Sequence, residues 1–312
     1  MIRSIRLIDF TALVSFSRKA FLNQAKSRAG FGGKGGEASS LTAFFDQWLS
    51  LDENRQTWIC IQEGQIHGLV SARSRAGPTV WEIDRLMLAG EDETKAICFD
   101  LLSYLSVVGG EVGVEKVFLR LPAASPFLGV ARQVGFSHYL SEILYRWDGQ
   151  STIGQHARMS HLLRPKSKRD EMGFFQLYNA TVPDCVRSVE AMTLREWRES
   201  RERGCHGWKS QEFILEKEDK IVGWLGVFAK GRIGHFDILI HPEEEDSLGA
   251  LVEAALSCFK GRSTVYCLVP EFAERLRRLL EEHGLQEEAE YSALVKQLAA
   301  RVRQPHLVLA RV

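Results

Sequence analysis

Two pairs of titratable residues, each with members two positions apart, are the best candidates for acid–base chemistry in this sequence. Glu82 and Asp84 lie in one largely apolar segment, and His235 and Asp237 lie in another. If each segment is a β-strand, the alternation of side chains directs both members of a pair to the same face. A titratable partner one step away can tune the pKa of a side chain towards neutrality, which suits a general base. The same residues also fit a simpler role as polar side chains on an exposed strand edge.

Three other features carry weaker chemical signals. The glycine-rich residues 30–36 lack the Gly-Lys-Ser/Thr ending of a P-loop and follow no apolar strand, so we interpret them as a flexible connector or lid. Cys205 and His206 place a thiol beside an imidazole, but adjacency in a loop does not make a catalytic dyad. The six cysteines include no Cys-x-x-Cys pair, and we therefore predict no metal site.

Length and composition limit the classes of protein that remain. The 312 residues are enough for about two domains. The composition, 45% hydrophobic and 26% charged, is typical of a folded globular protein. Forty basic residues balance forty acidic ones, so no overall positive field favours nucleic acid or an anionic membrane. No run of about 18 apolar residues predicts a membrane span, and we expect a cytoplasmic protein.

Two distant segments share one pattern of elements, which indicates an internal duplication. Residues 57–72 and 212–228 each read as a β-hairpin, with polar turns at Glu63-Gly64 and Glu218-Asp219. A glycine follows an isoleucine by two positions in the second strand of each hairpin, at Gly68 and Gly223, where a bulge or a close backbone approach would suit it.

The pattern continues in both copies after the hairpin. A further strand is predicted at 79–88 and 234–241, so that Asp84 corresponds to Asp237 and Glu82 to His235. Then come a helix (92–107 and 246–259), a short apolar strand (116–121 and 263–269), and a second helix that ends near Gly135 or Gly284. A last strand is predicted at 137–147 and 289–299. Residues 148–157 read as a linker. Residues 306–312 form either an added strand or a docking tail.

This order of elements resembles the GNAT superfamily of acyl-CoA-dependent N-acyltransferases, in two tandem copies that span nearly the whole chain. The matching residues are Ile66-His67-Gly68 and Gly135-Phe136 in the first copy, and Ile221-Val222-Gly223, Leu239-Ile240-His241-Pro242 and Gly284-Leu285 in the second. The resemblance implies acyl transfer to an amine, with a general base on the fourth strand. It also implies a tyrosine that protonates the leaving thiolate, but Ala131 and Leu280 occupy the two corresponding positions.

The resemblance also implies a loop after the fourth strand that receives the pyrophosphate of CoA on free N–H groups at a helix start. The second copy retains His241-Pro242 and the small pair Gly249-Ala250, so we assign acetyl-CoA or another acyl-CoA to this copy, bound by Leu239, Ile240, Leu248, Gly249 and Ala250. In the acidic run at 243–246, Glu245 stands where the family has a basic or amide residue, and Asp246 and Leu248 replace glycines of the family. These acids either complement the helix dipole or fill the anion site and repel a phosphate.

We therefore expect an α/β (α+β) fold of two tandem GNAT-like units, residues 1–148 and 158–312, joined by a linker at 149–157. Each unit would be a mixed, mostly antiparallel sheet flanked by helices. The expected function is acyl-CoA-dependent transfer to a small-molecule amine, with His235, Asp237, Glu82 and Asp84 as catalytic candidates. A catalytically silent tandem that serves as a binding module is the alternative. An enzyme that uses a carrier-protein thioester or aminoacyl-tRNA is a third possibility. The sequence does not define the oligomeric state.

Overall fold

The computed structural model of the protein describes residues 1–20, 23–27, 55–75, 77–89, 93–149, 163–200, 209–259 and 264–298. In the first half the strands are β1 (Ile2–Ser4), β2 (Arg55–Gln62), β3 (Gln65–Ser74), β4 (Val80–Leu88), β5 (Lys116–Pro122) and β6 (Ser137–Trp147), and the helices are α1 (Phe10–Lys19), α3 (Thr94–Glu111) and α4 (Leu128–Val134). The glycine-rich residues 30–36, Cys205-His206, the segment 306–312 and most of the predicted linker lie outside the described residues.

The second half repeats the order of the first. Its strands are β7 (Leu163–Pro165), β8 (Lys209–Lys217), β9 (Lys220–Lys230), β10 (Ile233–Ile240), β11 (Thr264–Pro270) and β12 (Gln286–Gln297), and its helices are α5 (Glu171–Thr181), α6 (Asp184–Glu190), α7 (Leu194–Ser200), α8 (Leu248–Ser257) and α9 (Glu274–Glu282). Both hairpin turns fall where the sequence predicts them, and Glu63, Gly64, Glu218 and Asp219 all have positive φ.

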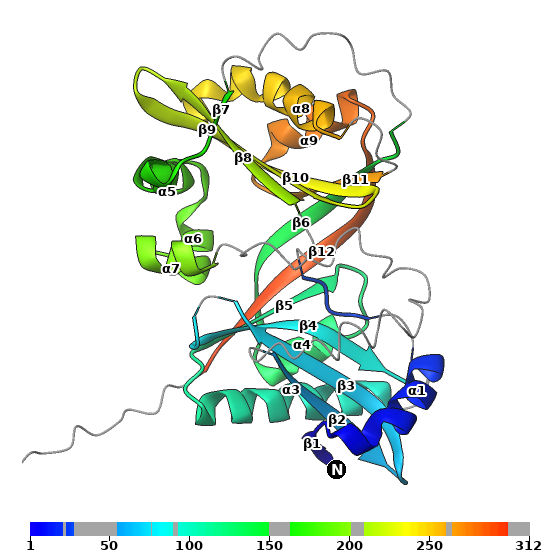
Figure 1. Cartoon of the computed structure of the whole chain (residues 1–312). Helices are drawn as coiled ribbons and strands as arrows, with labels where there is room; N and C mark the ends of the chain where they lie inside the picture. The colour runs from blue at the N-terminus through cyan, green and yellow to red at the C-terminus, as the bar shows by residue number, and fades with distance from the viewer. Residues whose placement is uncertain are drawn as a thin grey trace, which may run out of the picture.

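All twelve described strands form one sheet, in the order β1-β2-β3-β4-β5-β12-β6-β11-β10-β9-β8-β7 (Figure 1). Neighbouring strands are antiparallel except for β4 with β5 and β10 with β11. Helices cover both faces of this mixed sheet, which confirms the predicted fold class. The expected two sheets are nevertheless joined into one.

The two halves join because their last strands are exchanged. Strand β6 pairs with β11 and β12, which both belong to the second half, and β12 pairs with β5 and β6, which both belong to the first. Figure 1 shows β6 and β12 running side by side through the middle of the molecule. Neither last strand pairs within its own half, so the two predicted units do not form separate sheets. Their limits at residues 148 and 158 therefore stay a prediction from the sequence.

Each half packs helices on both faces of its part of the sheet. In the first half, α3 and α4 cover a core that includes Ile83, Leu101 and Leu121, while α1 covers the opposite face. In the second half, α8 and α9 cover one face and α5, α6 and α7 the other. Gly68 permits the close packing of α3, since a Cβ atom there would lie 2.7 Å from Ile97 Cγ2.

Both halves begin with the same arginine–aspartate bridge. Arg3 donates to both carboxylate oxygens of Asp9 at 2.7 and 2.6 Å, and Arg164 does the same to Asp170 at 2.8 and 2.8 Å. In each case the aspartate follows the arginine by six residues and also accepts a backbone N–H three residues before itself. A repeated bidentate contact of this kind supports the duplication independently of the strand pattern.

Candidate functional site

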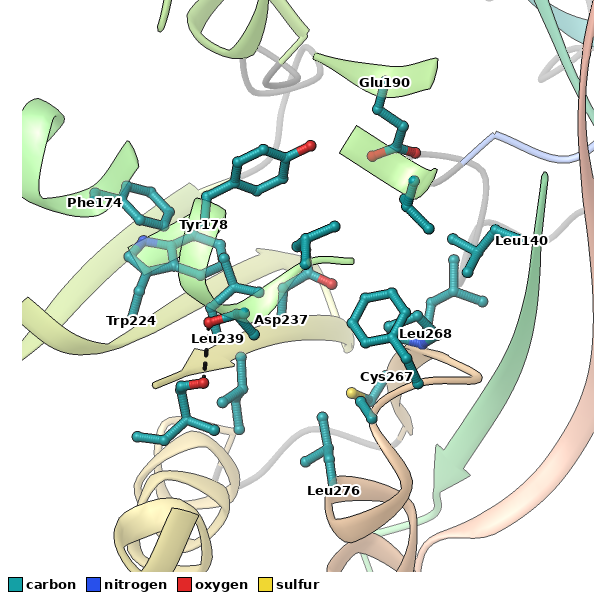
Figure 2. Close-up of a pocket in the computed structure, with 18 of the residues that line it drawn as sticks. Leu140, Phe174, Tyr178, Glu190, Trp224, Asp237, Leu239, Cys267, Leu268 and Leu276 are labelled. Atoms are coloured by element: carbon teal, nitrogen blue, oxygen red, sulfur yellow. Dashed lines mark hydrogen bonds between the residues drawn. The ribbon is translucent and has the colours of Figure 1, made fainter. Parts of the chain in front are cut away.

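A cavity of about 370 Å³ lies in the second half where β10 and β11 separate (Figure 2). The two parallel strands pair only from Ile233 to His235 on β10 and from Thr264 to Tyr266 on β11. Beyond these residues the strands diverge, and the cavity opens between them. Parallel strands that separate in this way expose edge groups of the backbone to whatever enters the gap.

The cavity passes through the sheet from one face to the other. On the side of α8 and α9 it is lined by Leu248, Cys267 and Leu276, which belong to the core under those helices. On the opposite side it is lined by Phe174 and Tyr178, which belong to the core under α5 and α6. Figure 2 shows Leu276 and Phe174 at opposite ends of this passage. Two molecules could therefore enter from opposite faces and meet in the gap.

The structure brings six of the sequence-predicted site residues to this cavity. Its lining includes His235, Asp237, Leu239, Ile240, Leu248 and, from the first half, Glu82. Gly249 and Ala250 lie in the first turn of α8 beside the cavity without lining it. Asp84 is not among the lining residues.

Asp237 is the carboxylate in the gap that has no partner among the described residues. It lies on β10 directly opposite Gly226 of β9, and Figure 2 shows its side chain pointing into the cavity. His235 lies two residues earlier on the same face, and its ring stacks on Phe228 with centroids 4.5 Å apart. The predicted alternation therefore holds for this pair.

Glu82 and Asp84 have ion-pair partners instead. Glu82 contacts Arg73 at 2.8 Å and Arg120 at 3.8 Å. Desolvation raises the pKa of Glu82, but the positive charges of Arg73, Arg75 and Arg120 outweigh it and hold that pKa below its ordinary value. Glu82 thus stays ionised and forms a fixed wall of the cavity.

Asp84 sits at an irregularity of β4, where the register against β3 shifts, and it pairs with Arg55 at 2.6 Å. The bulge reflects an extra residue that the predicted alternation does not anticipate. Asp84 is therefore held against Arg55 rather than in the cavity.

The equivalent gap of the first half is filled by the chain itself. Strands β4 and β5 pair only from Val80 to Ile83 and from Lys116 to Leu119. Past that point residues 23–27 bridge the strands: Gln24 N donates to Leu86 O of β4 at 2.9 Å, and Lys26 N donates to Arg120 O of β5 at 3.0 Å.

The side chain of Asn23 completes this bridge. Its Nδ2 donates to Asp84 O at 2.9 Å, and its Oδ1 accepts from Leu86 N at 2.8 Å and from Ala25 N at 3.2 Å. Ala25 is fully buried in the core under α3. We call residues 23–27 the plug, because they pair with backbone groups of β4 and β5 at the place where β10 and β11 of the second half leave a cavity.

The acidic loop before α8 is held to one side of the helix start. Residues Pro242–Ser247 form a 3₁₀ helix with Pro242 at its start, so α8 begins at Leu248 rather than at 246 as predicted. Glu244 pairs with Lys217, and Arg275 of α9 contacts Glu245 at 3.3 Å and Asp246 at 2.7 Å. Among the described residues no side chain caps the N-terminus of α8, although the Leu248 N–H donates to Glu245 O. The acids therefore do not cap the helix, and Glu245 lines the cavity while it is paired with Arg275.

The side chains that α5 and α6 contribute to the cavity were not among the predicted site residues. Phe174, Tyr178 and Glu190 line the cavity, yet their helical spacing reads only as core. The family position of the missing tyrosine is buried in both halves, at Ala131 and Leu280, so no acid is supplied there. Tyr178 is a phenol that reaches the cavity from a different element.

Two absences hold for the described residues. None of their helices combines the length and apolar character needed to cross a bilayer. They also contain no cluster of three or more His, Cys, Asp or Glu residues arranged to hold a metal ion.

Comparison with solved structures shows the fold. A GCN5-related N-acetyltransferase from Sphaerobacter thermophilus is similar over 97% of both chains, with 13% identity and a TM-score of 0.60. A tandem GNAT protein of the clavulanic acid biosynthesis pathway is similar over 97% of this chain and 99% of its own, with 10% identity and a TM-score of 0.56. A putative acetyltransferase from Pyrococcus horikoshii is similar over 97% and 91%, with 12% identity and a TM-score of 0.52.

No protein-family model matches the sequence, and no curated protein matches it. At such low identities the likeness is one of fold. The chain has the tandem GNAT fold that the sequence predicts.

Proposed function

We propose that this protein is an acyl-CoA-dependent N-acyltransferase and that its acyl-CoA site is the cavity between β10 and β11. The observation that carries the proposal is the passage through the sheet, which is lined from both faces. An acyl thioester entering from the α8–α9 side and an amine entering from the α5–α6 side would be held in contact, which lowers the entropic part of the barrier.

The lining on the donor side fits an acyl-pantetheine arm. Ile240 of β10 and Leu248 of α8, which belong to the core on that side, would contact the acyl and pantetheine groups. Leu239 lies opposite Trp224 and faces the other side of the sheet. The uncapped first turn of α8, with Gly249 and Ala250, would present N–H groups to the pyrophosphate. Acetyl-CoA is the simplest donor, and the length of the acyl group is set by the depth of the gap.

Asp237 is the proposed general base, with His235 beside it. Asp237 would accept a proton from the ammonium form of the acceptor and leave the free amine to attack the thioester carbonyl. The C–N bond forms as the C–S bond breaks. The second proton of the attacking nitrogen ends on the thiolate of CoA, so the products are an amide and free CoA.

The first half would bind no donor in this scheme, because the plug occupies its gap. Its role would be to complete the wall of the active cavity with Arg75, Glu82 and Arg120. The alternative of a silent tandem fits the filled first gap, but the cavity in the second half argues against it. The free thiols of Cys60, Cys98, Cys185 and Cys258 support a reducing, cytoplasmic location.

Calorimetric titration with acetyl-CoA and longer acyl-CoAs tests the donor. We expect binding at one acyl-CoA per chain; no heat with any donor at millimolar concentration would overturn the proposal. Thiol release from acetyl-CoA with a panel of primary amines tests the reaction. Asp237→Asn should bind acetyl-CoA like wild type and lose transfer by about 100-fold or more. The matched control is Asp219→Asn, which makes the same change in the exposed turn between β8 and β9.

A further inference from the structure

The acceptor side of the cavity carries a pattern of side chains that defines the class of amine. The register of β9 and β10 places Trp224 opposite Leu239, Gly226 opposite Asp237, and Phe228 opposite His235. Residues directly opposite each other point to the same face of a sheet. Except for Gly226, all of these residues line the cavity.

Gly226 lets two aromatic rings converge next to Asp237. A Cβ atom at Gly226 would lie 2.6 Å from the edge of the Trp224 indole and 3.0 Å from the Phe228 ring. Real Cβ atoms essentially never approach as closely as 2.6 Å, so a larger residue at 226 would displace the Trp224 ring and press on that of Phe228. The absence of a side chain at Gly226 therefore sets the aromatic wall beside the carboxylate.

Further aromatic contacts fix this wall in place. The Trp224 indole stacks on Phe174 with centroids 4.8 Å apart, and Phe174 in turn meets Trp197 edge-on at 4.9 Å. On the other side of Gly226, Phe228 stacks on His235. Rings held in this way present a rigid apolar surface on which another ring can stack.

The charges around the wall leave one negative group for the acceptor. Glu190 accepts from Tyr139 at 2.9 Å and pairs with Arg75 at 3.2 Å. Glu212 pairs with Lys166 at 3.1 Å. Glu82 is held by arginines, and Glu245 pairs with Arg275 at 3.3 Å. Asp237 remains as the carboxylate without a described partner, and it faces the rings.

This arrangement selects the acceptor by charge and by shape. A primary ammonium group would contact Asp237 while its body lay against Trp224 and Phe228. A carboxylate next to the amine would be brought towards Asp237, since the cavity arginines Arg75 and Arg120 already contact carboxylates. A polyamine would place its second cation on an apolar surface at a desolvation cost.

Resting on the proposed function, we infer that the acceptor is a monocationic primary amine with an aromatic or bulky apolar body and no neighbouring carboxylate. Asp237 would select the ammonium group, and the ring wall, formed by Trp224 and Phe228 over Gly226, would select the apolar body.

Three amines test this inference in the presence of acetyl-CoA. 2-Phenylethylamine, L-phenylalanine and spermidine respectively carry the ring alone, the ring with a carboxylate, and several cations with no ring. We expect kcat/KM for 2-phenylethylamine to exceed that for each of the others by about 100-fold or more. Equal use of L-phenylalanine, or a preference for spermidine, would overturn the inference.

Direct binding gives a readout other than activity. 2-Phenylethylamine should quench tryptophan fluorescence of the protein without acyl-CoA, and Asp237→Asn should raise its Kd about 10-fold. Gly226→Ala should displace Trp224 and raise the same Kd by at least as much, while acetyl-CoA affinity stays unchanged. If Gly226→Ala has a lower Tm, Trp224→Leu, which removes the ring without a backbone clash, provides the second test. An unchanged Kd in folded variants would refute the ring wall.

The two failures are distinguishable. If acetyl-CoA binds and some amine is acylated but the aromatic amine is not preferred, the inference fails and the proposed function stands. If no acyl-CoA binds, the proposed function fails as well.

Discussion

Arg120 on β5 donates its Nε–H to Glu142 on β6 at 2.6 Å, although β12 lies between the two strands. The register places Ala293 of β12 directly opposite Arg120, so a small side chain leaves room for the guanidinium to cross over it. The arginine side chain is 5% exposed and the glutamate is 0% exposed. This buried pair therefore joins the first half to both exchanged strands.

Removing one member of this pair should be strongly destabilising. Glu142→Gln leaves a buried guanidinium without its main counter-charge and should lower the free energy of unfolding by about 3 kcal/mol. The double variant Arg120→Met with Glu142→Met should recover most of the loss, because neither charge is then buried. Urea unfolding measures both. The control is Glu111→Gln at the exposed end of α3; an equal effect of the two Gln variants would contradict the prediction.

The repeated arginine–aspartate bridges should make the protein acid-sensitive. The Arg164 guanidinium holds the pKa of Asp170 well below its ordinary value, and Arg3 lowers the pKa of Asp9 in the same way. A carboxylate whose pKa is lower in the folded than in the unfolded protein contributes to the free energy of unfolding. This contribution is complete above the unfolded-state pKa of about 3.9, and it is lost as the pH falls to the folded-state pKa.

The free energy of unfolding of Asp170→Asn should therefore be about 2 kcal/mol lower than that of wild type at pH 7. This difference should be roughly 1 kcal/mol smaller at pH 3. Urea titrations at the two pH values measure this change, and Asp9→Asn should behave in the same way. Asp219→Asn, at an exposed turn, is the control with no expected pH dependence. A difference that grows as pH falls would show that the sign is wrong.

The plug should be held mainly by Asn23. Asn23→Ala removes three hydrogen bonds and leaves the Leu86 N–H without its acceptor, so we expect a loss of about 2 to 3 kcal/mol and faster hydrogen exchange of the Leu86 amide. Asn23→Asp keeps the acceptor and should lose less. Hydrogen exchange of β4 amides and calorimetry with acetyl-CoA check the prediction. Two acyl-CoA molecules bound per wild-type chain would mean that the plug does not fill the first gap.

Neutralising the acidic loop should tighten donor binding. Glu245→Gln removes a negative charge near the uncapped start of α8 and releases Arg275 from one partner. We expect the Kd for acetyl-CoA to fall about 5-fold, equivalent to roughly 1 kcal/mol, with a smaller gain at high salt. Glu282→Gln, at the exposed end of α9, is the matched control. Weaker binding by Glu245→Gln would indicate that the carboxylate supports the site.

Local signals in the sequence were sufficient for most elements. The hairpin turns are specified by Glu63-Gly64 and Glu218-Asp219, and the ends of α4 and α9 by Gly135 and Gly284, both of which have positive φ. Apolar alternation placed β10 correctly and with it the pair His235 and Asp237. These features depend on a few neighbouring residues, which is why a single sequence contains them.

The remaining features depend on distant residues. The alternation of apolar and polar residues in β6 would be the same whichever strands flanked it. The exchange with β12 therefore cannot be predicted from the sequence of β6. The plug has no periodicity, because its backbone is held by hydrogen bonds to two strands. Phe174 and Tyr178 look like core residues until the divergence of β10 and β11 is known. One missed signal was available: the spacing Arg3 to Asp9 recurs as Arg164 to Asp170.

The exchange of the last strands also sets the order in which this chain can mature. The ribosome releases β5 and β6 long before β12, so the first half emerges with a gap in its sheet that only the final stretch of β12, ending at Gln297, can close. A nascent chain would therefore carry these unpaired edges through about half of its synthesis, a state prone to aggregation. A chain truncated before residue 286 should depend on chaperones far more than the complete protein does.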